Sequence, residues 1–266
     1  MKHMPLYGAL AALLLALVSG CAMPPSSPVA TYQKAPLADG KRVTALLQNY
    51  PSVICVKDNT VYFADGTSLP YDDGLAKDFD HTLRQPDIED HFRQAYPALA
   101  PIEPPGLNFD PGRFRNDALL KKLYGGGQEE IEANLVEVNW LPVNEGKKLL
   151  FNKRENAAAQ LQKVSDELDR LPSHLLKYVK NIDSTYQYRP IQGTSRLSPH
   201  SYGIAIDLDN QYTAYWLWDK EYRYVNQVPR EVVEIFERHG FVWGGRWYHY
   251  DTMHFEYRPE MFERVL

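Results

Sequence analysis

Apolar residues that recur at intervals of three and four predict three helices. The clearest one spans residues 156–171 and is interrupted by Pro172. A second helix is predicted over residues 229–239, where Gly240 follows as a stop signal. A third covers residues 116–124 and ends at three consecutive glycines, which can adopt the left-handed backbone of a helix end.

Strands are predicted where β-branched and aromatic residues cluster. Residues 60–63 precede Asp65-Gly66, a dipeptide that takes hairpin angles readily, and residues 131–141 have residues 148–151 as a possible hairpin partner. Strands and helices do not alternate regularly. The pattern therefore predicts an α+β fold, with a small antiparallel sheet and flanking helices.

The first residues have the pattern of a secretion signal. A short positive start precedes the apolar run 6–18, which is too short for a bilayer span and ends at small residues. We interpret residues 1–20 as a signal peptide. Val18-Ser19-Gly20-Cys21 resembles the lipoprotein-processing box of bacteria, and this resemblance implies cleavage before Cys21 and its acylation. An ordinary secretory signal with an incidental cysteine is the alternative.

This resemblance predicts a lipoprotein held at the cell envelope through lipidated Cys21. It would face the periplasm, at the outer membrane if the source has two membranes. Residues 21–40 are rich in proline and are interpreted as a tether. Residues 41–150 read as an accessory region, and residues 151–266 as the main domain. If Cys21 is acylated, Cys55 has no other cysteine with which to form a disulfide within the chain.

Composition narrows the possible partners. The 266 residues are 44% apolar and carry a formal net charge of -5. A chain of this length and apolar content can bury one sizeable core. It has no basic block or run of arginines with aromatics, so the sequence does not indicate nucleic-acid binding.

The most informative stretch is residues 198–209. Ile204, Ile206 and Leu208 alternate with smaller or polar residues at the strand period, so they should face the core while Asp207 lies on the opposite face. A carboxylate in the middle of such a strand is costly unless a charge compensates it, and a metal ion would do so. His200 precedes Gly203, where the chain can turn and bring the imidazole over Asp207.

A second histidine completes a possible zinc site. His254 with His200 and Asp207 would leave a fourth zinc position open, as hydrolytic zinc requires. Asp251 is the candidate general base, but a spacing of three on a straight strand would put it on the face opposite His254. Asp251 must therefore lie in a turn or bulge. Calcium bound by Asp207 and Asp209 is an alternative that lacks the dense oxygen spacing of a calcium loop.

These residues form two motifs with a family resemblance. The motifs are Ser198-x-His200-x-x-Gly203-x-Ala205-x-Asp207 and Asp251-x-x-His254. They resemble the D-alanyl-D-alanine carboxypeptidase family of zinc peptidases, which includes D-Ala-D-Ala dipeptidases and L-alanyl-D-glutamate endolysins and shares its fold with Hedgehog signalling domains. The resemblance implies Zn²⁺ bound by His200, Asp207 and His254, with Asp251 as the base. The Asp form of the base also occurs in the endolysin branch.

The same resemblance implies a substrate and further site residues. Peptidoglycan stem peptides with D-amino acids would be cleaved, and an arginine upstream of the first motif would contact the substrate. Arg189 is the best match, followed by Arg196. Ser198 and Trp247 are further candidates for substrate contact, with Trp247 at the rim of a groove. Glu256 is expected to support a ligand or to form an ion pair.

Beside a calcium-stabilised structural lipoprotein, which is the third reading, two functions remain open from the sequence. The first is a zinc peptidase, either D,D-carboxypeptidase-like or specific for L-Ala-D-Glu bonds. The second is a non-catalytic lipoprotein that keeps the fold and binds cell wall or a partner protein. Because Asp251 is present, the sequence favours the enzyme. The motifs do not indicate which bond is cut or what oligomer the chain forms.

Overall fold

The computed structural model describes residues 40–191, 193–218 and 220–262. They belong to one compact unit, Lys34–Leu266. The predicted signal peptide, and all but the last residue of the predicted tether, lie outside the described residues. Among the helices that the structure describes, none has both the length and the apolar character that a bilayer span requires.

The first part of the described chain combines a helix with a small sheet. Helix α1 (Gly40–Asn49) packs against strand β1 (Val53–Lys57), which pairs antiparallel with β2 (Thr60–Phe63). β2 in turn pairs with β3 (Ser68–Pro70) across the predicted hairpin turn. Helix α2 (Phe79–Arg84) follows, and a connection whose only helical element is the 3-10 turn η1 (Glu89–Phe92) leads on to residue 116.

The middle of the chain confirms the predicted third helix and hairpin. Helix α3 (Asp117–Tyr124) starts at Asn116, whose side chain accepts a hydrogen bond from the Leu119 amide. Strands β4 (Leu135–Trp140) and β5 (Lys147–Asn152) pair antiparallel, as predicted. The strand predicted from residue 131 begins later, because helix α4 (Gln128–Glu132) forms first.

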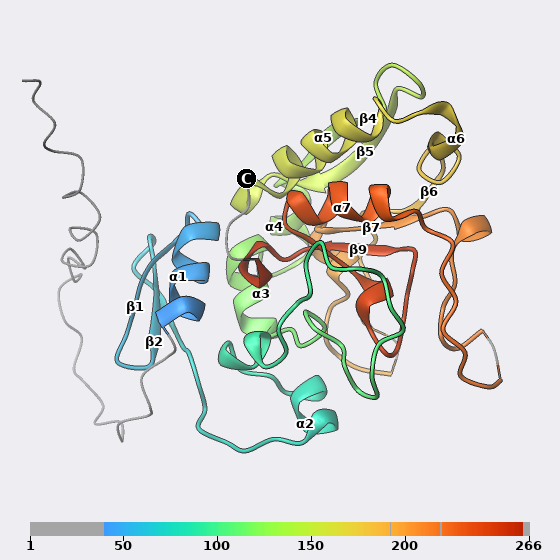
Figure 1. The fold of residues 1–266 in the computed structure, drawn as a ribbon. Coiled ribbons are helices and arrows are strands. Elements are labelled where there is room, and N and C mark those ends of the chain that lie inside the picture. The colour runs from blue at the N-terminus through green and yellow to red at the C-terminus, as the bar shows by residue number, and fades with distance from the viewer. Residues whose placement is uncertain (1–39, 192, 219, 263–266) are drawn as a thin grey trace, which may run out of the picture. The chain divides into compact units, whose positions relative to one another are not determined.

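The last part contains the sheet that carries the motifs. Its antiparallel strands lie in the order β6 (Ile182–Ser184), β7 (Ala205–Leu208), β9 (His254–Tyr257) and β8 (Phe241–Trp243). Helices α5 (Ala157–Leu168) and α7 (Arg230–Arg238) pack against each other, α5 also against β4 and α7 against β8 (Figure 1). Both helices were predicted from their apolar spacing. Helices and antiparallel sheets in this order confirm the α+β class.

The remaining helical elements are short. They are α6 (Ser173–Leu176), η1 (Glu89–Phe92), η2 (Arg154–Asn156), η3 (Pro199–Tyr202), η4 (Asn210–Tyr212), η5 (Gly244–Arg246) and η6 (Pro259–Met261). The η elements are single turns of 3-10 helix. Helix α1 packs against η6, so the beginning and the end of the described chain meet.

One hydrophobic cluster contains residues from both predicted regions. Leu46 and Phe63 belong to the same buried cluster as Ile206 and Phe255. The predicted boundary between residues 150 and 151 falls inside strand β5.

Cys55 bears on the predicted acylation of Cys21. It is buried in β1, and the structure describes it as disulfide-bonded. The expectation that Cys55 has no partner cysteine depends on the acylation of Cys21, which remains a prediction.

Candidate metal centre

Asp207 and His254 lie directly opposite each other on neighbouring strands. In the antiparallel pairing of β7 with β9, Asp207 faces His254. Ile206 and Phe255 form the next pair and are fully buried on the other face of the sheet. The alternation predicted from the sequence is thus confirmed, and it places one carboxylate beside one imidazole.

A tight turn brings His200 to the same place. His200 lies on η3, and Gly203 ends this turn with a φ of 66°. A Cβ atom at Gly203 would lie 2.6 Å from Cδ2 of Leu135, so both the backbone angle and the lack of space require glycine. The predicted turn is confirmed: Nε2 of His200 lies 3.1 Å from Oδ2 of Asp207.

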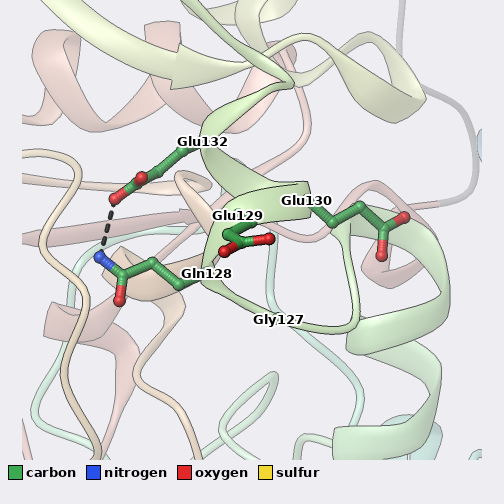
Figure 2. A pocket seen from close by; sticks show the side chains of 5 residues that line it. All are labelled: Gly127, Gln128, Glu129, Glu130 and Glu132. Atoms are coloured by element: carbon green, nitrogen blue, oxygen red, sulfur yellow. Dashed lines mark hydrogen bonds between the residues drawn. The ribbon is translucent and has the colours of Figure 1, made fainter.

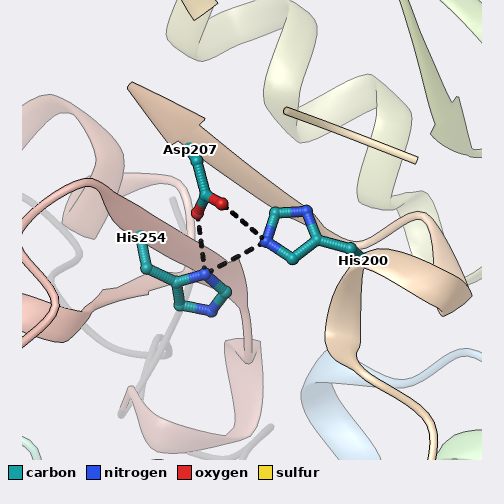
Figure 3. A group of neighbouring side chains, drawn as sticks. All are labelled: His200, Asp207 and His254. Atoms are coloured by element: carbon teal, nitrogen blue, oxygen red, sulfur yellow. Dashed lines mark hydrogen bonds and ion pairs between the residues drawn. The ribbon is translucent and has the colours of Figure 1, made fainter. Parts of the chain in front are cut away.

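The three side chains form a compact triangle. His254 Nδ1 lies 3.0 Å from Asp207 Oδ1 and 3.3 Å from His200 Nε2. Figure 3 shows these atoms pointing toward one another. Ligands about 2.0–2.1 Å from a tetrahedral zinc ion are separated by roughly 3.3 Å, so the observed separations fit one ion.

Each histidine ring has a second nitrogen that points away from Asp207, and the hydrogen bond made by that nitrogen determines which ring atom faces the three-residue cluster. His200 Nδ1 lies 2.7 Å from the carbonyl oxygen of Thr185, to which it can donate a hydrogen bond. His254 Nε2 lies 3.4 Å from Oε2 of Glu256. In neutral rings, these acceptors leave the lone pairs of the other nitrogens facing Asp207. Three acceptor groups so close together need a shared cation or shared protons, and this donor set suits zinc.

Without a metal ion, protons stabilise this triangle. Burial tends to raise the pKa of Asp207, but hydrogen bonds from His200 and His254 outweigh it and hold that pKa well below its usual range. Burial opposes protonation of His254, yet the carboxylates of Asp207 and Glu256 raise its pKa to about 9. A metal ion must displace this proton, so metal affinity should fall as the pH is lowered.

Asp251 lies in a turn at the entrance of β9, as its spacing requires. The His254 amide donates to the Asp251 carbonyl, and the Asp251 amide donates to the carbonyl of Gly244. A Cβ atom at Gly244 would lie 2.3 Å from the Asp251 carbonyl oxygen, so this approach needs glycine. Oδ1 of Asp251 is buried without a hydrogen-bond partner. Burial, reinforced by Asp207, raises the pKa of Asp251 to about 6, which suits a general base near neutral pH.

The two candidate arginines occupy different environments. Arg189 is exposed, and its Nε donates to the side chain of Gln187. Arg196 is partly buried and donates to the backbone carbonyl of Arg115, 3.3 Å away. Burial and the positive charge of Arg115 lower the pKa of Arg196. Within the described ranges, no carboxylate lies within ion-pair distance of Arg196, so this cation is available to an anionic ligand.

Ser198 and Trp247 are both buried. The Ser198 hydroxyl accepts a hydrogen bond from the His200 amide and thereby caps η3. Trp247 is only 3% exposed, and its indole nitrogen donates to the carbonyl of Pro111. Its ring lies 5.7 Å from that of His254. The predicted position of Trp247 at an exposed groove rim is wrong, because the residues around Pro111 cover the ring.

Residues 110–115 belong to the surroundings of the site, although the sequence assigned no chemistry to them. Arg115 forms hydrogen bonds with both carboxylate oxygens of Glu256. Asp110 is fully buried and accepts hydrogen bonds from His249 and Arg113. Three charged residues in a connection that contains Pro and Gly would normally be exposed. Their partners are buried and lie far away in the sequence, so only the tertiary structure shows that these three residues are not exposed.

Other clusters of charge do not compete with this centre. A surface pocket lined by Gly127, Gln128, Glu129, Glu130 and Glu132 contains none of the predicted site residues (Figure 2). The ammonium group of Lys77 forms ion pairs with Asp73, Asp87 and Asp90, so a lysine already neutralises that acidic group. Asp209 caps η4 and is not one of the three grouped ligands.

A comparison with known protein families supports the motif. Residues 192–257 match the family model described as D-alanyl-D-alanine carboxypeptidase. This segment carries the signature of that peptidase family. The match includes His200, Asp207, Asp251 and His254. It covers only about a quarter of the chain. No curated protein and no solved structure matches the chain significantly.

Proposed function

We propose that this protein is a zinc-dependent peptidase that cleaves amide bonds involving D-amino acids in peptidoglycan stem peptides. The observation that carries the proposal is the triangle of His200, Asp207 and His254, next to Asp251, whose Oδ1 is buried without a hydrogen-bond partner. The match to D-alanyl-D-alanine carboxypeptidases supports the substrate class. By the same resemblance, we expect the four-stranded sheet and its helices to have the Hedgehog/DD-peptidase fold.

The side chains present can divide the chemistry among themselves. His200, Asp207 and His254 would hold the metal, which supplies a Lewis acid that polarises a carbonyl group and acidifies water. Asp251 would accept a proton from the attacking water and later deliver it to the leaving amine. Its pKa of about 6 lets the carboxyl group exchange that proton near neutral pH.

An arginine would stabilise the negative charge that develops on the substrate. Arg189 matches the family position, whereas Arg196 is the partly buried cation with no carboxylate at ion-pair distance in the described part of the chain. A desolvated guanidinium interacts more strongly with an oxyanion or a peptide carboxylate than an exposed one does. This difference favours Arg196 as the substrate contact. Loss of activity in Arg189→Met with full activity in Arg196→Met would reverse the choice.

The proposal is tested with metal analysis and one isosteric variant. Purified mature protein should contain about one zinc ion per chain. Asp251→Asn should keep that ion while turnover of muropeptides falls by roughly 10²-fold or more, because an amide cannot serve as the base. Asp183→Asn, which changes an exposed carboxylate on β6, is the matched control and should keep full turnover.

The products distinguish the remaining possibilities. Mass spectrometry of digested muropeptides would show whether a terminal D-alanine is released or an internal L-Ala-D-Glu bond is cut. If zinc is bound but no muropeptide is cleaved, the protein is instead a binding module of the cell wall. Zinc-free protein with unchanged turnover would overturn the metal assignment.

The predicted membrane anchor needs a separate test. A sulfur atom that carries a lipid thioether cannot also form a disulfide, and the structure describes Cys55 as disulfide-bonded. Because the chain has only two cysteines, acylation of Cys21 and this disulfide are alternatives. The intact mass of protein from membranes, before and after reduction, distinguishes them. A mass several hundred daltons above that of the unmodified chain would indicate acylation. A gain of about two daltons on reduction would indicate the disulfide.

A further inference from the structure

Glu256 lies between one proposed metal ligand and a buried arginine. Its carboxylate is fully buried, with Oε2 3.4 Å from His254 Nε2. Arg115 donates to it from Nε at 2.9 and 2.8 Å and from the terminal nitrogen Nη2 at 2.6 Å. Nη1 of Arg258 lies 3.5 Å from Oε1 of Glu256. Two guanidinium groups therefore hold this carboxylate, and its Oε2 contacts both Arg115 and His254.

Arg115 reaches this position from a distant part of the chain. It precedes helix α3 by two residues and lies outside the segment 192–257 that matches the peptidase family. Its guanidinium lies 5.6 Å from the centre of the Trp247 ring, and that ring lies 5.7 Å from the ring of His254. Arg115 thus contacts both Glu256 and Trp247, which in turn contact the His254 imidazole.

We propose that Arg115 and Glu256 are positioning residues that orient His254 so that its Nδ1 faces the metal. The inference rests on the proposed zinc centre. A carboxylate that accepts the Nε2 hydrogen bond fixes the tautomer and the ring orientation, and makes the other nitrogen a better ligand. A bidentate arginine fixes the carboxylate in turn, because two parallel hydrogen bonds restrict its rotation.

The other histidine does not depend on a side chain in this way. His200 is oriented mainly by the backbone carbonyl of Thr185, at 2.7 Å. A side-chain substitution leaves this backbone carbonyl in place. Mutation therefore cannot remove the main hydrogen bond that orients His200 without disturbing the backbone. The supports of His254 are side chains, and one of them is supplied by residues that precede the family segment. The proposal thus gives the predicted accessory region a direct role in metal binding.

The test is the zinc dissociation constant of the full mature chain, measured by competition with a chromophoric chelator at constant pH. Arg115→Met and Glu256→Gln should each weaken zinc binding by roughly 10- to 100-fold. Arg115→Lys should recover part of the loss, because an ammonium group keeps the charge but not the two parallel hydrogen bonds. The absorption spectrum of the cobalt-substituted protein should change in Arg115→Met, which reports ligand geometry independently of turnover.

Arg246→Met is a matched control. Arg246 is also a buried arginine, and it donates to both carboxylate oxygens of Glu237. This pair is not in contact with any of the three proposed ligands. The control should lose stability but keep the wild-type affinity for zinc. An equal loss of affinity in Arg246→Met would show that general destabilisation explains the effect, and would overturn the proposal.

The remaining outcomes are also decisive. If Arg115→Met fails to fold, Arg115→Lys and Glu256→Gln decide the question, and wild-type zinc affinity in both would overturn the proposal. If the wild-type protein itself binds no zinc, the proposed function has failed. If it binds zinc and the variants bind equally well, only the positioning role has failed.

Discussion

Two buried clusters of charge lie close together near the end of the chain and differ in how their polar atoms are satisfied. In the candidate metal centre, two imidazoles and the Asp207 carboxylate converge, and Oδ1 of the neighbouring Asp251 has no hydrogen-bond partner. In the cluster around Arg258, the charged side chains have hydrogen-bond partners. The contrast supports the proposal that the first cluster binds a cation, whereas the second stabilises the fold.

The Arg258 cluster connects distant parts of the chain. Arg258 donates to Glu260 at 2.6 Å, and Tyr50 of the segment after α1 donates to the same carboxylate. His91 Nε2 accepts the Asn116 amide at 2.7 Å, and its Nδ1 lies 3.2 Å from Oε1 of Glu260 and 2.9 Å from Nη2 of Arg258. Burial and the charge of Arg258 lower the pKa of His91, which keeps the ring neutral. Such a network stabilises the fold by linking distant segments.

Removing a histidine from the metal centre should have the largest effect. His200→Ala or His254→Ala deletes one of the three converging ligand groups, so bound zinc and peptidase turnover should both fall below detection. Metal analysis and a muropeptide assay measure this directly. His174→Ala, on the short helix α6, is the control and should change neither quantity. Full zinc retention in His200→Ala would remove His200 from the ligand set.

Breaking the Arg258 cluster should affect stability rather than metal binding. Glu260→Gln leaves the buried guanidinium of Arg258 without a carboxylate on that side, which should cost about 3–5 kcal/mol in the free energy of unfolding. Urea denaturation of the metal-loaded protein measures this cost. Zinc stoichiometry should remain at the wild-type value. Loss of zinc with unchanged stability would contradict the division of roles between the two clusters.

The unsatisfied carboxyl group should destabilise the metal-free protein at neutral pH. Because the folded protein raises the pKa of Asp251 from 3.8 to about 6, its stabilising contribution is complete below about pH 4 and is lost as the pH rises through 6. Asp251→Asn should therefore raise the free energy of unfolding at pH 7–8, by at most about 3 kcal/mol. The advantage should disappear toward pH 4. Thermal unfolding of both metal-free proteins across this pH range tests the sign, and a destabilised Asp251→Asn protein at pH 8 would contradict it.

The smallest effect is expected from a substitution of Tyr50 in the Arg258 cluster. Tyr50→Phe removes one hydrogen bond to Glu260 but leaves its contacts with Arg258 and His91. The free energy of unfolding should fall by about 1 kcal/mol, the usual net value of one hydrogen bond, with a larger loss if the carboxylate is left poorly solvated. Zinc affinity should not change. A tenfold weaker affinity would show that the two clusters are coupled through Arg258 and Glu256.

The sequence by itself determined the elements whose signals are local. Apolar spacing located α5 and α7, Asp65-Gly66 located a hairpin turn, and alternation placed Ile206 in the core and Asp207 on the opposite face. It also grouped His200, Asp207 and His254, because a turn at Gly203 and the motif order suffice to bring them together. The spacing of Asp251 required a turn, and the structure has one.

Only the tertiary structure decided which distant residues complete the site. Arg115 and Glu256 are 141 positions apart, and no local pattern in either segment indicates the other. For the same reason, the sequence suggested an exposed Trp247, because the cover comes from residues near Pro111. Periodicity reports which face of an element is apolar, but not which remote segment packs against it. The two motifs therefore predicted the candidate ligands, and packing between distant segments determined which residues surround them.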